Sequence, residues 1–235
     1  MDDDFLICND DRCVLMAEDL LDDAAEDTAT TKFNQVIADL SKVYPKAILV
    51  GAVAAAKYVR NPRSPRETED IDVLLGEKDY AEFLIDQIPE SKLKVLETYF
   101  DNSDSVFHSL RHKETGVYVD LLSTESTPIR KRIARHVLHH RDQATHLLVG
   151  EDHWIDILQP ELLLAMKVNR YGKDPKTDRG LSDRLDIEKI LKTLMERQMP
   201  IDHGKVKSFL SRHEITKYEA ILEDVSAELA EPPAQ

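Results

Sequence analysis

Two aspartates in the segment EDIDVLL have the spacing of a metal-binding pair. Residues two apart on a β-strand lie on the same face, so Asp70 and Asp72 project side by side while Ile71 and Val73 face a core. Adjacent carboxylates repel each other unless a positive charge lies between them. A hard cation such as Mg²⁺, which prefers oxygen ligands, meets that need. The strand over residues 70–75 therefore predicts a cation site.

The residues ahead of this strand predict a turn suited to phosphate. The apolar stretch 47–50 predicts a short buried strand, and the small residues of 52–58 predict a helix that lies close to a sheet. Gly51 and Ala52 stand at the turn between them, where the backbone N–H groups of a helix start attract anions. A Gly-Ala pair alone is a weak signal, and its position before the paired aspartates makes it informative.

The order Gly51-Ala52, a spacer, and then TEDIDVLL from Thr68 resembles the signature of the DNA polymerase β-like nucleotidyltransferase superfamily. The longer segment RETEDIDV, which begins at Arg66, is most similar to the small bacterial AbiEii-type nucleotidyltransferases. The resemblance implies an α/β (α+β) nucleotidyltransferase fold, in which a mixed sheet with flanking helices precedes a helical C-terminal half. It implies transfer of an NMP from an NTP to an acceptor hydroxyl, with two Mg²⁺ ions held in part by Asp70 and Asp72. The nucleotide-binding residues that it implies here are Gly51, Ala52, Arg66 and Thr68.

A third aspartate stands in the apolar stretch VYVDLL, the predicted second arm of a hairpin over residues 106–122. An unpaired carboxylate in such a strand is costly. One interpretation pairs Asp120 with Arg111 or Lys113 across the hairpin. The superfamily places a third catalytic carboxylate on such a strand. The resemblance therefore implies that Asp120 binds the metal next to the acceptor hydroxyl, where it can also act as general base.

The last third of the chain carries the remaining candidates. The segment LQPELLLAMK resembles the family segment that supplies a lysine to the nucleotide phosphates, which assigns this role to Lys167. The segment SDRLDI resembles the family's Lys-Asp-x-x-Asp-Leu/Ile element. Asp183 and Asp186 are then a second acidic pair near the nucleotide, with Asp186 preferred. The alternative interpretations are a surface lysine and, for Asp183, an acid favoured by the dipole at a helix N-terminus.

Composition is that of a globular protein, with 42% apolar and 32% charged residues. No apolar run approaches the roughly 20 residues needed to cross a bilayer, and the start MDDDFLICNDD lacks the basic region of a secretory signal. Cys8 and Cys13 are the chain's two cysteines, too few for a disulfide framework or a four-ligand zinc site. We interpret them as incidental thiols and expect a cytoplasmic protein without a membrane partner.

The net charge of −14 is concentrated at the start of the chain. Residues 1–27 contain eleven Asp or Glu and one basic residue, Arg12, and so contribute −10, which leaves −4 for the rest. We expect this segment to be solvated, with a short helix near residues 16–21. The expected organisation is an acidic N-terminal segment over 1–30, a catalytic domain over 31–158 and a helical subdomain over 159–230.

A basic helix is predicted over residues 128–141, whose sequence is PIRKRIARHVLHHR. Such a charge run is usually a solvated face, and the alternative is a basic rim for phosphates or RNA. AbiEii-type relatives often act as toxins beside an antitoxin, so an RNA or tRNA acceptor and an antitoxin partner follow by analogy alone. A rival interpretation is a catalytically quiet nucleotide- or partner-binding module. Ala52, where the family usually has Gly or Ser, favours that rival mildly, and the complete set of aspartates opposes it.

Periodicity and turn residues predict the other elements. The expected helices cover 33–43, 78–88, 160–170, 182–197, 204–212 and 214–229, the expected strands cover 92–99, 146–149 and 153–157, and loops are expected over 61–66 and 171–180.

Overall fold

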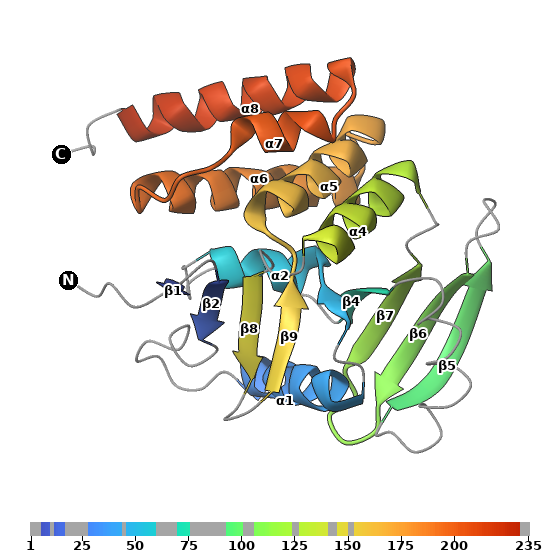
Figure 1. The fold of residues 1–235 in the computed structure, drawn as a ribbon. Coiled ribbons are helices and arrows are strands. Elements are labelled where there is room, and N and C mark those ends of the chain that lie inside the picture. Colours follow the sequence, from blue (N-terminus) through green and yellow to red (C-terminus); the bar gives the residue numbers. More distant parts are fainter. Residues whose placement is uncertain are drawn as a thin grey trace. The chain divides into compact units, whose positions relative to one another are not determined.

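The computed structural model of this chain describes residues 6–9, 12–16, 28–43, 46–59, 70–75, 93–100, 106–123, 127–140, 145–149 and 153–230 (Figure 1). The chain divides into two compact units. The first contains Met1–Ala54 and Pro62–Leu158, and the second contains Ala55–Asn61 and Gln159–Gln235. The helix α2 (Gly51–Tyr58) begins in the first unit and ends in the second.

The first unit is built on a mixed sheet. Its strands among the described residues follow the order β1-β2-β8-β9-β3-β4-β7-β6-β5. The pairs β2–β8, β9–β3 and β4–β7 are parallel, and the other pairs are antiparallel. The strand bounds are β1 (Leu6–Asn9), β2 (Arg12–Met16), β3 (Ile48–Leu49), β4 (Asp70–Leu75), β5 (Leu93–Phe100), β6 (Val106–His112), β7 (Tyr118–Ser123), β8 (Thr145–Val149) and β9 (His153–Ile157).

Two helices of the first unit bury apolar faces. The helix α1 (Thr28–Val43) contacts β8 and β9 and buries Val36, Ile37 and Leu40, which recur at three and four residues as a helix face requires (Figure 1). The helix α4 (Pro128–His139) starts with Pro128 after Thr127, whose hydroxyl accepts the Arg130 N–H. Its buried side consists of Ile129, Ile133, Ala134 and Val137.

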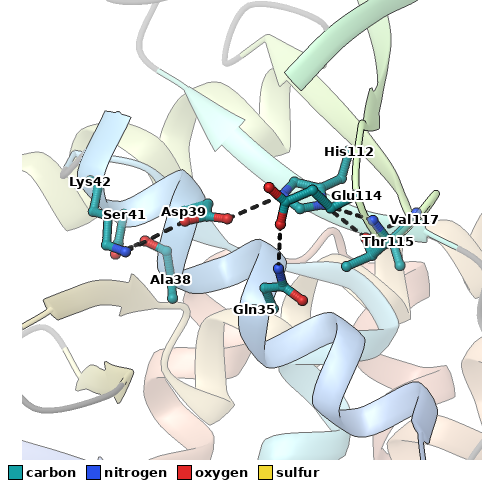
Figure 2. Close-up of polar contacts among 9 residues, drawn as sticks. All are labelled: Gln35, Ala38, Asp39, Ser41, Lys42, His112, Glu114, Thr115 and Val117. Atoms are coloured by element: carbon teal, nitrogen blue, oxygen red, sulfur yellow. Dashed lines mark hydrogen bonds and ion pairs between the residues drawn. The ribbon is translucent and has the colours of Figure 1, made fainter. Parts of the chain in front are cut away.

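A buried histidine joins α1 to the turn between β6 and β7 (Figure 2). His112 is fully buried, and its Nε2 lies 3.1 Å from Asp39 Oδ2 on α1. The Thr115 N–H donates to His112 Nδ1 over 3.2 Å, which assigns the ring proton of the neutral form to Nε2. One turn earlier on α1, Gln35 donates to Glu114 over 2.8 Å. These contacts hold the hairpin that carries Asp120 against α1.

The second unit is mainly helical. Its long helices are α5 (Pro160–Lys173), α6 (Asp178–Glu196) and α8 (Arg212–Ala230), with the short α7 (His203–Ser208) between α6 and α8. Contacts join α5 to α6, α7 and α8, and α6 to α8. The apolar core of this unit contains Leu162, Leu163, Val168, Ile187, Ile190, Leu191, Leu194, Val206, Tyr218, Ile221 and Val225.

The mixed sheet and the helical C-terminal half confirm the fold class predicted from the sequence, and two local expectations differ. Met16 lies in β2 rather than in a helix, because β2 pairs with β8 far along the chain. The expected loop over 171–180 shrinks to residues 174–177, since α6 begins at Asp178, four residues before the predicted start, with Thr177 as its cap. The expected helix over 78–88 and loop over 61–66 lie outside the described residues. Among the helices that the structure describes, none is long and apolar enough to cross a bilayer.

A candidate carboxylate site and a buried ion cluster

The structure brings two of the predicted carboxylates together on neighbouring strands. The parallel register of β4 and β7 pairs Asp72 with Asp120, and it pairs Asp70 with Tyr118. Paired residues share a face of the sheet, and neighbouring strands lie about 4.8 Å apart. All three aspartates are half-buried, whereas the alternate residues Ile71 and Val119 are fully buried. The aspartates therefore lie on one face of the sheet, opposite the apolar residues between them.

Gly51 lies directly against Asp72. Its φ of +71° is in the left-handed region, and a Cβ built on it would lie 1.9 Å from Asp72 Oδ2. The Val50 N–H donates to the Asp72 carbonyl oxygen over 3.0 Å, which fixes the end of β3 beside β4. The Asp72 carboxylate thus lies so close to the start of α2 that no side chain fits at position 51. Ala52 follows in the first turn of α2, as the sequence predicts, and is half-buried.

The hairpin register bears on the alternative partner for Asp120. In the β6–β7 pair, Asp120 lies opposite Ser109, and Arg111 lies opposite Tyr118. The Arg111 guanidinium donates to the Gly116 carbonyl oxygen over 3.3 Å and lies 5.9 Å from the centre of the Tyr118 ring. These contacts direct Arg111 toward the turn rather than toward Asp120. They do not support the cross-hairpin ion pair with Arg111 that the sequence left open.

The carboxylates Asp72 and Asp120 are oxygen ligands of the type that Mg²⁺ prefers. Within the described ranges, no three His, Cys, Asp or Glu side chains converge closely enough to hold a metal ion. Mg²⁺ is commonly bound by one or two carboxylates together with water and substrate phosphates, rather than by a complete protein cage. The register pair Asp72 and Asp120 fits that pattern in ligand type and in number.

The second unit gathers the other predicted site residues into a buried ion cluster between α5 and α6. Lys167 Nζ lies 2.7 Å from Asp186 Oδ2 and 3.6 Å from Asp183 Oδ1. Two nitrogens of the Arg170 guanidinium bind the two oxygens of Asp183. Lys167, Asp183 and Asp186 are all buried, and two cations match two carboxylates. Pairing of this kind is what allows charges to be buried.

The cluster decides between the interpretations that the sequence offered for its members. Lys167 is no exposed surface lysine, since its relative exposure is 2%. Asp183 lies in the second turn of α6, and its carboxylate binds Arg170 and Lys167 rather than the helix start. Sequence reasoning missed Arg170, although its position one helical turn after Lys167 places both on one side of α5. Arg66 and Thr68 lie outside the described residues.

The basic helix exists as predicted and has a basic side. No acidic residue occurs in α4, and the exposed basic side chains of the helix and its C-cap are Arg132, Arg135, His139 and His140. Arg135 and His139 are one turn apart, and Arg132 is three residues before Arg135, so these side chains share a face. The opposite side carries the buried apolar residues, so α4 is amphipathic with a cationic surface.

No protein-family model matches the sequence, and no curated protein matches it. Among solved structures, the chain is similar to an antigenic nucleotidyltransferase-like protein from Paracoccidioides brasiliensis. The identity is 15% and the TM-score 0.55, over 85% of this chain and 91% of that one. It is also similar to the antibiotic-resistance factor ANT(2'')-Ia in solution. There the identity is 12% and the TM-score 0.45, over 84% of this chain and 98% of the other. The second TM-score is too low to establish a common fold, whereas the first shows the fold of a nucleotidyltransferase-like protein.

Proposed function

We propose that this protein is a Mg²⁺-dependent nucleotidyltransferase that moves an NMP from an NTP to an acceptor hydroxyl. The observation that carries the proposal is the register pair of Asp72 and Asp120 against the side-chain-free start of α2 at Gly51. This arrangement supports the proposal, because carboxylate oxygens are ligands that Mg²⁺ prefers and the backbone N–H groups of a helix start attract phosphate. The likeness of the fold to a nucleotidyltransferase-like protein supports the reaction class by analogy.

We assign the three aspartates separate roles in the reaction. Asp72 and Asp120, with Asp70, would hold Mg²⁺, with two ions in the full site. When bound, Mg²⁺ supplies the positive charge that offsets the negative charge on the attacking, phosphoryl and leaving oxygens. Asp120 accepts the proton of the acceptor hydroxyl. The acceptor oxygen then bonds to the α-phosphorus, and the bond from that phosphorus to the bridging oxygen breaks, which releases pyrophosphate.

The other nucleotide contacts remain proposals of the same kind. The N–H groups of Gly51 and Ala52 receive triphosphate oxygens, and Arg66 and Thr68 lie near the nucleotide. Lys167 contributes an ammonium to the phosphates, with Asp183 and Asp186 setting its position. An ammonium has three N–H donors, and Asp186 at 2.7 Å and Asp183 at 3.6 Å engage at most two of them, which leaves one for a phosphate oxygen.

We propose RNA as the acceptor, with tRNA as the class to test first. The cationic surface of α4 is the feature that supports it, because phosphate contacts dominate nucleic-acid affinity. The AbiEii-type resemblance adds a toxin role beside an antitoxin protein and a cytoplasmic location, both by analogy.

The experiment that tests the reaction incubates the full chain with each labelled NTP, Mg²⁺ and total RNA, and follows where the label goes. Asp72→Asn and Asp120→Asn should each abolish transfer, because each removes a proposed metal ligand. Neither should unfold the chain, because each removes one of two carboxylates that repel each other. Glu223→Gln, which alters an exposed acid on α8, is the matched control and should transfer normally. Label transfer that survives both aspartate variants would exclude this site. NTP binding without transfer in the unmodified chain would favour the quiet binding module.

The acceptor is tested separately by salt dependence. Charge reversal at Arg132 and Arg135 should weaken RNA binding. It should also make log affinity fall less steeply with log salt, by about one unit of slope for each phosphate that the helix no longer binds. The control reverses the exposed Lys176 and Arg179, which changes the net charge equally in the second unit. Equal effects of both double variants would argue against α4 as the RNA surface. Transfer that ignores salt and both reversals would favour a protein or small-molecule acceptor.

A further inference from the structure

The chain's two cysteines lie directly opposite each other in the fold. In the antiparallel pair of β1 and β2, Cys8 is in register with Cys13, between the pairs Ile7–Val14 and Asn9–Arg12. Residues in register share a face of a sheet. The sequence alone offers two thiols five residues apart, a spacing that carries no such information. The hairpin register turns them into a cross-strand pair.

The backbone spacing of such a pair suits a disulfide. Opposed residues in an antiparallel pair have Cα atoms about 4.5 Å apart at non-hydrogen-bonded positions and about 5.5 Å apart at hydrogen-bonded ones. Disulfides accept Cα separations of about 4.4–6.8 Å and need Cβ atoms about 3.5–4.5 Å apart, and the closer, non-hydrogen-bonded kind of pair meets the second condition best. Ile7 pairs with Val14 and therefore lies on the opposite face from Cys13. A cysteine at position 7 could not bond to Cys13 in this register.

The place of the hairpin in the sheet gives the bond a structural consequence. In the strand order, β1 is the edge strand and pairs with β2, and β2 continues the sheet through its parallel pairing with β8. An edge strand is held from one side, so it can separate from its neighbour more easily than an internal strand. A covalent link between Cys8 and Cys13 would keep β1 attached to β2.

We propose that Cys8 and Cys13 are a redox-active pair that forms a reversible intrachain disulfide. The oxidant is a small-molecule disulfide such as oxidised glutathione. The thiolate of one cysteine attacks the oxidant, which forms a mixed disulfide and releases one glutathione thiolate. The thiolate of the second cysteine attacks the protein sulfur of the mixed disulfide and releases the second glutathione. The two protons of the cysteine thiols end on the two released glutathione molecules, so two thiols are oxidised and one disulfide is reduced.

The test equilibrates the full chain with mixtures of oxidised and reduced glutathione, blocks remaining thiols by alkylation, and digests the chain with trypsin without reduction. Arg12 lies between the two cysteines, so trypsin separates residues 1–12 from 13–32. The expected product is one linked peptide pair that reduction splits in two. The matched control combines Cys8→Ser with Ile7→Cys, which keeps two cysteines nearby but places them on opposite faces.

The two chains should differ in what they form. We expect the unmodified chain to form the intrachain bond with an equilibrium constant at least on the order of tenfold above that of the control variant, which should instead carry glutathione adducts. In urea, where the hairpin is unfolded, the two chains should become alike. Equal intrachain bonding in both folded chains, or two glutathione adducts on the unmodified chain, would overturn the proposal. This inference is independent of the proposed nucleotidyl transfer.

Discussion

Replacing Gly51 with alanine tests how closely the start of α2 approaches Asp72. The residue has a φ of +71°, and a Cβ on it would lie 1.9 Å from Asp72 Oδ2 and 2.7 Å from Asp72 Cβ. Atoms cannot remain at those distances, so either the Asp72 side chain or the backbone of β4 must move. Gly51→Ala should therefore lower stability through two separate effects, the left-handed backbone and the clash.

A second glycine separates these effects. Gly116 also has a positive φ, of +76°, but its nearest neighbour to a built Cβ is an Arg111 nitrogen 3.2 Å away at the end of a flexible side chain. Gly116→Ala should thus show backbone strain alone, about 1–2 kcal/mol. Gly51→Ala should cost a further amount of about 1–3 kcal/mol, which is typical of overpacking.

The assay is urea unfolding of both variants and of a cycle with Asp72→Gly, which removes every Asp72 atom that the new Cβ would meet. In the Asp72→Gly background, Gly51→Ala should cost only the strain of about 1–2 kcal/mol seen at Gly116. The reasoning is refuted if Gly51→Ala costs no more than Gly116→Ala. It is equally refuted if the cost of Gly51→Ala is the same with and without the Asp72 side chain.

Three further variants test contacts elsewhere in the chain. Burial lowers the pKa of Lys57 from 10.5 to about 8, so Lys57→Met should stabilise the protein by up to about 3 kcal/mol at pH 7, where the ammonium is charged in both states. This gain should shrink as the pH rises from 8 to 10.5, because the Lys57 ammonium loses its proton at a lower pH in the folded state than in the unfolded state. Urea titrations that show the same gain at every pH would contradict this expectation. Asp39→Ala should cost about 1–3 kcal/mol of stability, because it leaves the buried His112 Nε2 proton unpaired. Asp39→Asn keeps an acceptor and should cost clearly less. Equal shifts of the melting temperature in the two variants would count against the hydrogen bond between His112 and Asp39. At Glu214 burial acts to raise the carboxyl pKa, but hydrogen bonds from Ser211 and Asn169 outweigh it, so the pKa is lowered. Glu214→Gln should therefore cost about 1 kcal/mol at neutral pH, and the difference from the unmodified chain should vanish as the pH falls below 4.5; persistence in acid would refute the charge-based account.

Local patterns were sufficient to predict many of the elements. The recurrence of Val36, Ile37 and Leu40 predicted α1, and the alternation around Asp70 and Asp72 predicted β4. Proline and capping residues marked helix starts well at Pro128 and less well at α6, where Thr177 was overlooked as the cap. These successes share a cause, since side-chain periodicity and capping depend on residues within one or two turns of each other.

Contacts between distant segments were beyond the same reasoning. The fully buried His112 gave no signal in the sequence, because its partner Asp39 lies 73 residues away on α1. The Lys167 cluster was anticipated as a set of residues through the family resemblance, but its pairing with Asp186 and the part of Arg170 depend on how α5 packs against α6.

By itself, the sequence determined that Asp70 and Asp72 share one face of a strand, because a strand repeats every two residues whatever it pairs with. Only the tertiary structure decided that Asp72 stands beside Asp120, that Gly51 leaves no room for a side chain there, and that Cys8 opposes Cys13. Each of these depends on strand order and register. Register is set by hydrogen bonds and packing between segments, and a shift of one residue would move every side chain of a strand to the other face.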